Sequence, residues 1–172
     1  MQITLENIIV WLFSALAVAS AIIMITRRNP IKSVLFLVVN FFCISALYLM
    51  LRAQFIAIIQ IIVYAGAIMV LFLFVIMLLN LQNESKLSEN FTYKKITAIL
   101  LAILLFAALA VSTFFGFFQK YPSISPNAEF IGTIESNGKV LYTLYSFPFE
   151  LVSFILLAAI VGAIVLAKKK FE

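Results

Sequence analysis

Uncharged, strongly apolar stretches alternate with short charged segments along the chain. Five such stretches occupy residues 7–26, 33–51, 53–83, 96–119 and 151–167. Their lengths are 20, 19, 31, 24 and 17 residues. An α-helix needs about 20 residues to cross about 30 Å of hydrocarbon. The pattern therefore predicts an all-α integral membrane protein with five transmembrane helices.

We expect residues 1–172 to form a single membrane domain with one sizeable loop. The helices are predicted at about residues 6–26, 31–51, 54–82, 95–118 and 149–168, with an extracytoplasmic loop at 119–148. Pro30 is suited to the first turn of the second helix, because proline fixes φ and its missing N–H is not needed there. Only Arg52 separates the second and third stretches, which predicts a tight hairpin.

The third stretch is about ten residues longer than a straight span requires. It must tilt, extend into the interface or contain an irregularity. Gly66 lies near its centre beside Tyr64, and a glycine at that depth indicates either a close helix contact or a π-bulge. The Tyr64 hydroxyl needs a polar partner there, because an unpaired donor in hydrocarbon is costly.

Two interpretations of the loop before the fifth span fit the local rules equally well. Asn137-Gly138, flanked by β-forming residues, is a hairpin signal. Leu141, Leu144 and Tyr145, at spacings of three and four, indicate instead one face of a short interfacial helix. Local chemistry does not decide between them.

Positive charge is distributed unevenly between alternate loops. The first loop, the third loop and the C-terminal tail together carry 9 Lys or Arg residues, and the other extramembrane segments carry 3. The positive-inside rule therefore predicts an N-terminus outside and a cytoplasmic C-terminus. The basic residues stand at span ends and are not interleaved with aromatic residues, so we expect lipid contacts and no nucleic-acid partner.

Composition excludes much of the chemistry that a membrane enzyme could perform. The chain has no His, no Asp and a single Cys, Cys43, and 65% of its residues are hydrophobic. It cannot supply a His or Cys metal site, a catalytic triad or the ligands of an iron–sulfur cluster. We therefore expect no catalytic residue, no metal site and no cofactor-binding residue on this chain.

Few polar residues lie at membrane depth, and each has two interpretations. Glu150 borders the fifth span, either as a functional acid or as an interfacial charge at the N-terminal end of a helix. Gln54 and Gln60 in the third span either form interhelical hydrogen bonds or line a water path. A pump or antiporter would need more buried ionisable groups, so these residues favour a subunit of a larger assembly.

Two stretches are specific enough to indicate a family. They are RNPIKSVL at residues 28–35 and QIIVYAGAIMVLFLFV at residues 60–75. Further agreement lies at residues 77–81, 141–142, 145, 148–151 and 162–165. Together these segments closely resemble NADH-quinone oxidoreductase subunit J, the chain 6 family of respiratory complex I. The resemblance covers the second, third and fifth spans well and the first and fourth mainly by hydropathy.

The resemblance implies a non-redox membrane-arm subunit of NADH:quinone oxidoreductase, an enzyme complex that acts as a proton translocase. It also implies that the chain is a multi-pass protein of a bacterial inner (cell) membrane. Expected partners are chains A, H and K and an antiporter-like chain, with NADH, FMN, iron–sulfur clusters and quinone bound by partner subunits. The expected function is to shape or gate the water path that couples quinone reduction to proton pumping. The alternative is a purely structural adaptor that holds neighbouring subunits together.

The resemblance also places the family's π-bulge around residues 64–69. It makes Tyr64, Gly66, Ala67 and Met69 the residues of a gating helix, and it favours a short helix before the Pro-Phe-Glu segment that enters the last span. Some family members carry an acid at the position of Gln54 or Gln60. Both are amides here and cannot release a proton, so any carboxylate on a proton path must come from neighbouring chains.

Overall fold

The computed structural model describes residues 5–79, 93–118 and 131–168. Every element in this part of the chain is helical, and five helices are long and apolar enough to cross a membrane. This confirms the predicted class. The spans are α1 (Leu5–Thr26), α2 (Pro30–Met50), a third span (Gln54–Leu79), α5 (Tyr93–Phe118) and α8 (Ser146–Ala167).

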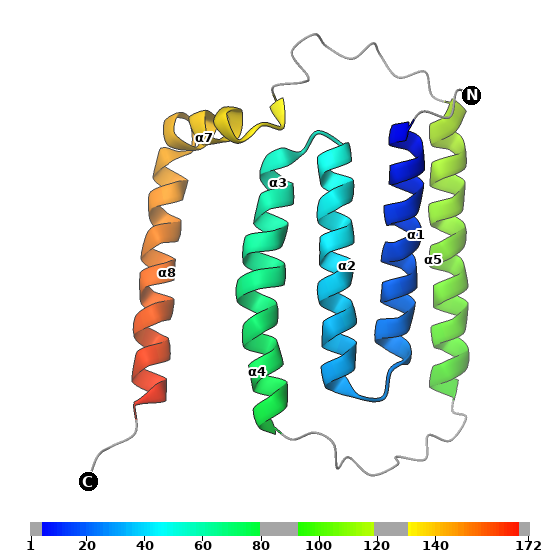
Figure 1. Cartoon of the computed structure of the whole chain (residues 1–172), viewed down its shortest axis with the longest axis horizontal. Coiled ribbons are helices and arrows are strands. Elements are labelled where there is room, and N and C mark those ends of the chain that lie inside the picture. The colour runs from blue at the N-terminus through cyan, green and yellow to red at the C-terminus, as the bar shows by residue number, and fades with distance from the viewer. Residues whose placement is uncertain (1–4, 80–92, 119–130, 169–172) are drawn as a thin grey trace.

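The third span is composite. It begins as α3 (Gln54–Ile59), continues as the π-helix η1 (Gln60–Ile68) and ends as α4 (Met69–Leu79). Figure 1 shows the three pieces as one continuous column beside α2. The predicted end of this span at residue 82, and the loop that follows, lie outside the described residues.

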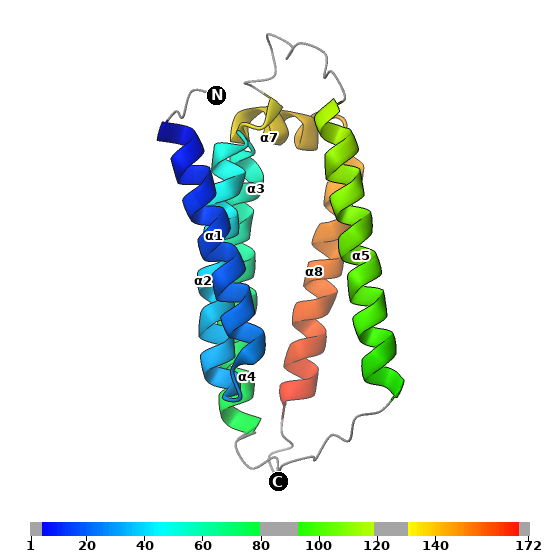
Figure 2. The same cartoon turned by 90° about the vertical axis from the view of Figure 1, so that its right-hand side faces the viewer.

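The helices form an open arrangement. α1, α2 and the third span lie side by side, while α7 (Ile134–Thr143) crosses one end of the molecule and leads into α8 (Figure 1). Figure 2 shows α5 well apart from α1, α2 and the third span, and it makes at most marginal contact with the rest of the described chain. The most apolar parts of α5 and α8 bury no residue against the part of the chain that the structure describes.

The turn between α1 and α2 is fixed by its own sequence. The Asn29 side chain caps α2 by accepting hydrogen bonds from the backbone N–H groups of Ile31 and Lys32, at 3.0 and 3.3 Å. Pro30 occupies the first helical position, as predicted. Deeper in the pair, the Asn40 amide donates to the Ala17 carbonyl at 2.7 Å, so this polar side chain connects the two spans.

The pairing of α2 with the third span contains most of the small core. Val34, Met69 and Ile76 are buried together at this contact. Ser45, only 1% exposed, donates its hydroxyl to the Ala57 carbonyl at 2.8 Å. These contacts hold the third span against α2 on both sides of the π-helix.

The predicted hairpin at Arg52 has an additional partner. Arg52 adopts a positive φ of 61°, which lets α2 turn into α3 within three residues. The segment that precedes α7 docks on this turn, where the Phe55 N–H donates to the Gly132 carbonyl at 3.2 Å. A Cβ at Gly132 would lie 2.1 Å from the Arg52 carbonyl oxygen, so only glycine allows this approach.

The loop before the last span contains a helix and not a hairpin. Asn137 and Gly138 lie inside α7, whose first turn is capped by the Thr133 side chain through the Ser136 N–H at 3.2 Å. The β-hairpin interpretation is therefore wrong, because the cap and the docked Gly132 start a helix at this point. α8 begins at Ser146, before the predicted start at residue 149, and Pro148 lies in its first turn, where proline is tolerated. Residues 119–130 of the predicted loop lie outside the described residues.

Candidate functional site

The π-helical segment η1 is the most unusual backbone feature of the chain. π-helices are rare and mostly occur as single turns within α-helices, frequently at functional sites. Here the segment extends over nine residues in the middle of a span. A Cβ on Gly66 would lie 3.3 Å from the Ile61 carbonyl oxygen, five residues earlier, so glycine also eases this backbone geometry.

The π-helix changes which side chains of the third span face α2. The buried residues of this span are Ala57, Gln60, Ala65, Met69 and Ile76. The successive intervals are three, five, four and seven residues. Intervals of three, four and seven keep side chains on one face of an α-helix, but an interval of five does not. The interval of five lies within η1. Beyond it, the residues that face α2 come one position later in the sequence than they would in a regular α-helix.

As a result, the residues that a regular α-helix would bury are exposed. Four residues after Gln60 stands Tyr64, which is 46% exposed, and four residues later Ile68 is 44% exposed. The adjacent Ala65 and Met69 are buried in their place. The third span therefore has two conceivable registers, and the structure holds the one that leaves Tyr64 exposed at the edge of the contact with α2.

Gln60 is a polar side chain within this contact. It is 8% exposed, yet no hydrogen bond within the described residues involves its amide. No side-chain N or O atom in that part of the chain is both fully enclosed and unpaired, so the amide keeps some access to the chain's surface. A buried amide without a partner is costly, which makes Gln60 a place where water or a polar group of another chain would bind.

The predicted gating residues divide between two environments. Tyr64 lies edge-on to Phe41 of α2, with ring centroids 5.8 Å apart. Its hydroxyl forms no hydrogen bond within the described residues and is available to an external partner. Ala67 is exposed, Gly66 is half-buried and Met69 belongs to the core with Val34 and Ile76.

The other polar candidates do not join this site. Gln54, at the start of α3, is exposed. Glu150 is also exposed, one turn inside α8, and α8 packs on α7 but not to any extent on the third span. The sequence pointed to both Gln54 and Gln60, but it does not show which of the two amides is buried. The interval of five between Gln60 and Ala65 could not be predicted from the sequence either, because it is visible only once the buried positions are known.

The side chains near η1 limit the chemistry of the site. Neither Gln60 nor Tyr64 carries a carboxyl group, and the described residues contain no group of three His, Cys, Asp or Glu side chains that could hold a metal ion. An amide can orient water through its donors and acceptor, and a hydroxyl can both donate and accept. The arrangement can therefore organise water, while any carboxylate that exchanges protons must come from elsewhere.

The architecture defines a class: a multi-pass helical membrane protein with a π-helix in the middle of one span and little intramembrane charge. The family model for NADH-ubiquinone/plastoquinone oxidoreductase chain 6 matches residues 20–166. The chain therefore belongs to the chain 6 family, known in bacteria as NADH-quinone oxidoreductase subunit J.

Curated relatives extend over nearly the whole chain. NADH-ubiquinone oxidoreductase chain 6 of Cyanidium caldarium is 40% identical, over 94% of this chain and 84% of the relative. NADH-quinone oxidoreductase subunit J of Rickettsia prowazekii is 34% identical, over 93% and 79% of the two chains. The chloroplastic NAD(P)H-quinone oxidoreductase subunit 6 of Marchantia polymorpha is 36% identical, over 96% and 89%. All three are subunits of quinone oxidoreductases, so the chain is similar to proteins of one kind of assembly.

Proposed function

We propose that this chain is a non-redox membrane-arm subunit of a proton-translocating NADH:quinone oxidoreductase, in which the third span gates a water path. The observation that carries the proposal is the interval of five between buried Gln60 and buried Ala65. It gives one helix two possible faces toward α2, around a side-chain amide that has no hydrogen-bond partner among the described residues. A helix with two arrangements can open and close a path without titrating a group of its own.

The two registers suggest how the gate operates. In the π register, Tyr64 lies exposed at the edge of the contact with α2, against Phe41, and Gln60 retains access to the surface. Loss of the π turn would rotate Tyr64 toward α2, on the face that Gln60 occupies. There the phenol would compete with water for the amide. Water would thus reach Gln60 in one register and be displaced in the other.

The open faces of α5 and α8 support a subunit role. Neither helix buries a residue of its most apolar part against the other described residues. We propose that helices of partner chains cover part of these faces, with chains A, H and K and an antiporter-like chain as the partners. NADH, FMN, iron–sulfur clusters and quinone would bind to other subunits, and the membrane would be a bacterial inner membrane.

Replacing Gln60 with leucine tests the gate. Gln60→Leu keeps a side chain of similar volume, although one bond shorter, and removes the amide that would hold water. In inverted membrane vesicles containing the whole complex, proton translocation per NADH oxidised is expected to fall several-fold, while uncoupled quinone reduction remains close to the wild-type rate. Proton uptake and NADH oxidation are measured on the same vesicles.

The matched control is Gln54→Leu. It makes the same substitution in the same span at an exposed position, and it is expected to leave the ratio of protons to electrons unchanged. An unchanged ratio in Gln60→Leu would overturn the gating proposal. The structural-adaptor alternative predicts a different result: less complex on a native gel, with normal pumping by the complex that does assemble.

A further inference from the structure

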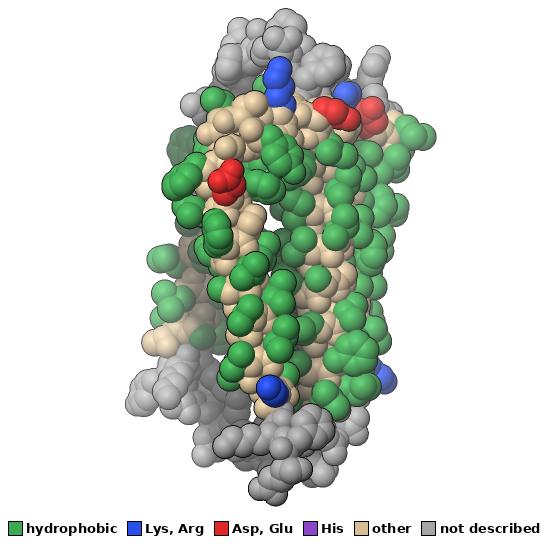
Figure 3. Space-filling view, turned by 90° about the vertical axis from the view of Figure 1, so that its left-hand side faces the viewer, with side chains coloured by type: hydrophobic (Ala, Val, Ile, Leu, Met, Phe, Trp, Pro, Cys, Tyr) green, Lys and Arg blue, Asp and Glu red, His purple; other side chains and the backbone are tan. Residues whose placement is uncertain are grey.

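Acidic side chains of the described residues lie toward one end of the molecule only, an end that also carries Arg52 and Lys139. The three acidic residues of this part of the chain, Glu6, Glu135 and Glu150, all belong to the end that carries α7. Figure 3 shows the acidic side chains gathered toward that end of the face it presents, with hydrophobic side chains over the spans. At the opposite end, the α1–α2 turn presents Arg27, Arg28 and Lys32.

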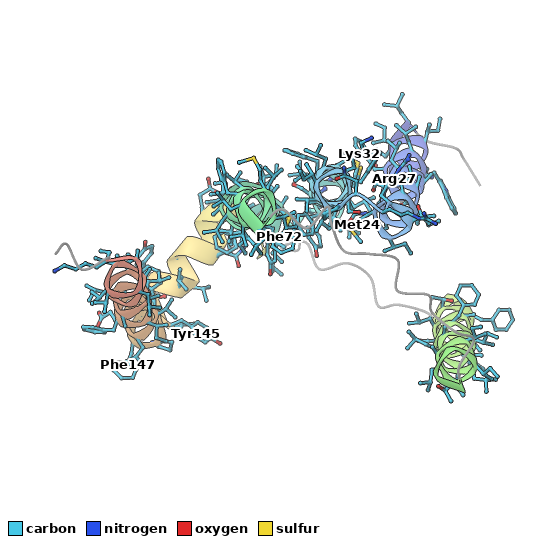
Figure 4. The ribbon with its side chains drawn as sticks, turned by 90° about the horizontal axis from the view of Figure 1, so that it is seen from below. Met24, Arg27, Lys32, Phe72, Tyr145 and Phe147 are labelled. Carbon is cyan, nitrogen blue, oxygen red and sulfur yellow. The ribbon has the colours of Figure 1, made fainter. Side chains whose placement is uncertain are left out.

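These three basic side chains stand on a rigid turn. Besides the Asn29 cap, the Ser33 hydroxyl donates to the Met24 carbonyl at 2.9 Å and so ties α2 back to the end of α1. Arg27, Arg28 and Lys32 themselves are exposed. Figure 4, seen from this end, shows Arg27 and Lys32 where α1 and α2 meet. Three cations are thus held within one turn without an acidic neighbour from the described residues.

Arg27 has a defined orientation. Its guanidinium carbon lies 5.7 Å from the centroid of the Phe36 ring, a cation–π contact between the end of α1 and the first turns of α2. Stacking of this kind holds the planar group by its face and leaves its N–H edge available. The guanidinium N–H groups form a fork that matches two oxygens of a phosphate, and Lys32 adds a compact second charge.

Apolar surface continues directly from this charged turn toward the membrane interior. Ile25 on α1 is 73% exposed and Leu35 on α2 is 52% exposed. A ligand that fits both features has an anionic phosphate head and an apolar tail. An acidic protein segment would pair with the basic side chains, but it would not cover the exposed apolar side chains of Ile25 and Leu35.

We propose that the α1–α2 turn binds the phosphate of an anionic phospholipid through Arg27 and Lys32, with Arg28 adding charge and the acyl chains lying along Ile25 and Leu35. The positive-inside rule assigns this end to the cytoplasmic leaflet, where anionic lipids attract basic residues at span ends. The site is separate from η1 and does not depend on the proposed gate.

Photolabelling of the whole complex tests the site. The complex is reconstituted into phosphatidylcholine vesicles that contain a trace of phosphatidylglycerol with a photoreactive group in one acyl chain. The same experiment is repeated with the matching photoreactive phosphatidylcholine. Labelled peptides are then mapped by mass spectrometry. We expect phosphatidylglycerol to label residues 24–36 of this chain several-fold more than phosphatidylcholine does.

Substitution then separates the site from general lipid contact. Arg27→Gln combined with Lys32→Gln is expected to lower phosphatidylglycerol labelling of residues 24–36 to the phosphatidylcholine level. Lys168→Gln, which removes a charge at the C-terminal end of α8, should not change it. All substituted side chains are exposed, so assembly on a native gel should match the wild type. Equal labelling by the two lipids in the wild type, or unchanged labelling in the double variant, would overturn the proposal.

Discussion

Gly132→Ala is expected to detach the segment before α7 from the α2–α3 turn. The new Cβ would lie 2.1 Å from the Arg52 carbonyl oxygen and 3.3 Å from the Ala53 Cα, and these are backbone atoms that cannot rotate away. The glycine has no positive φ, so space and not conformational freedom requires it. Overpacking of this kind costs about 1–3 kcal/mol. Separation would also leave the Phe55 N–H without its acceptor, for a similar cost of about 1–3 kcal/mol if that group stays buried.

The consequence should extend beyond the turn. α7 packs on α3 and α8, so the docked segment is the main described connection between the last span and the first three. We expect Gly132→Ala to reduce the amount of intact complex that survives mild heating, as measured on a native gel. Hydrogen exchange of the Phe55 amide should accelerate in parallel.

Gly138→Ala is the control for this substitution. Gly138 lies inside α7, and a Cβ there would meet no atom within 4 Å. Alanine in a helix interior is favoured over glycine by about 1 kcal/mol, so this variant should be as stable as the wild type or slightly more so. The docking interpretation fails if both variants survive heating equally and Phe55 exchanges at the same rate in each.

Gly66→Leu is expected to uncouple the complex or stop its turnover. The Cβ would press on the Ile61 carbonyl at 3.3 Å, a contact that arises because η1 brings residues five apart together. An extra side chain at that point disfavours the π register. A penalty of about 1–3 kcal/mol changes the ratio of two registers by about five- to 150-fold. We expect a loss of proton translocation of comparable size in inverted vesicles.

Graded substitutions make this result interpretable. Gly66→Ala adds only the Cβ and should produce an intermediate loss, whereas Gly162→Ala in α8 meets no atom of this chain within 4 Å and should pump like the wild type. A native gel establishes that each variant assembles. Normal pumping by assembled Gly66→Leu complex would show that the register of η1 does not matter for coupling.

The sequence predicted the spans and the exclusions because both depend on composition within short segments. Five charge-free stretches of sufficient length predict membrane helices, and a chain without histidine and with one cysteine cannot supply a set of His or Cys ligands whatever its fold. Asn29-Pro30 likewise marked the start of α2, since a cap and an N1 proline act within one turn. The family resemblance pointed to the third span as the special helix.

Other features could not be predicted, because they depend on residues far apart in the chain. Asn137-Gly138 is a good local hairpin signal, yet the Thr133 cap and the contact of Gly132 with Arg52 place it inside α7. Gln54 and Gln60 are equivalent by sequence, but only Gln60 turns toward α2. Hydropathy does not distinguish the two, since nearly every neighbour in the span is apolar.

The sequence by itself determined that this chain has five segments long and apolar enough to cross a membrane, that it contains no histidine and a single cysteine, and that one of the five segments has residues to spare. Only the tertiary structure decided how those residues are used. They allow a π-helix that buries Ala65 and Met69 against α2 and leaves Tyr64 and Ile68 exposed. The physical reason is that apolar composition sets whether a segment enters the membrane, whereas packing against a neighbouring helix sets which face it buries.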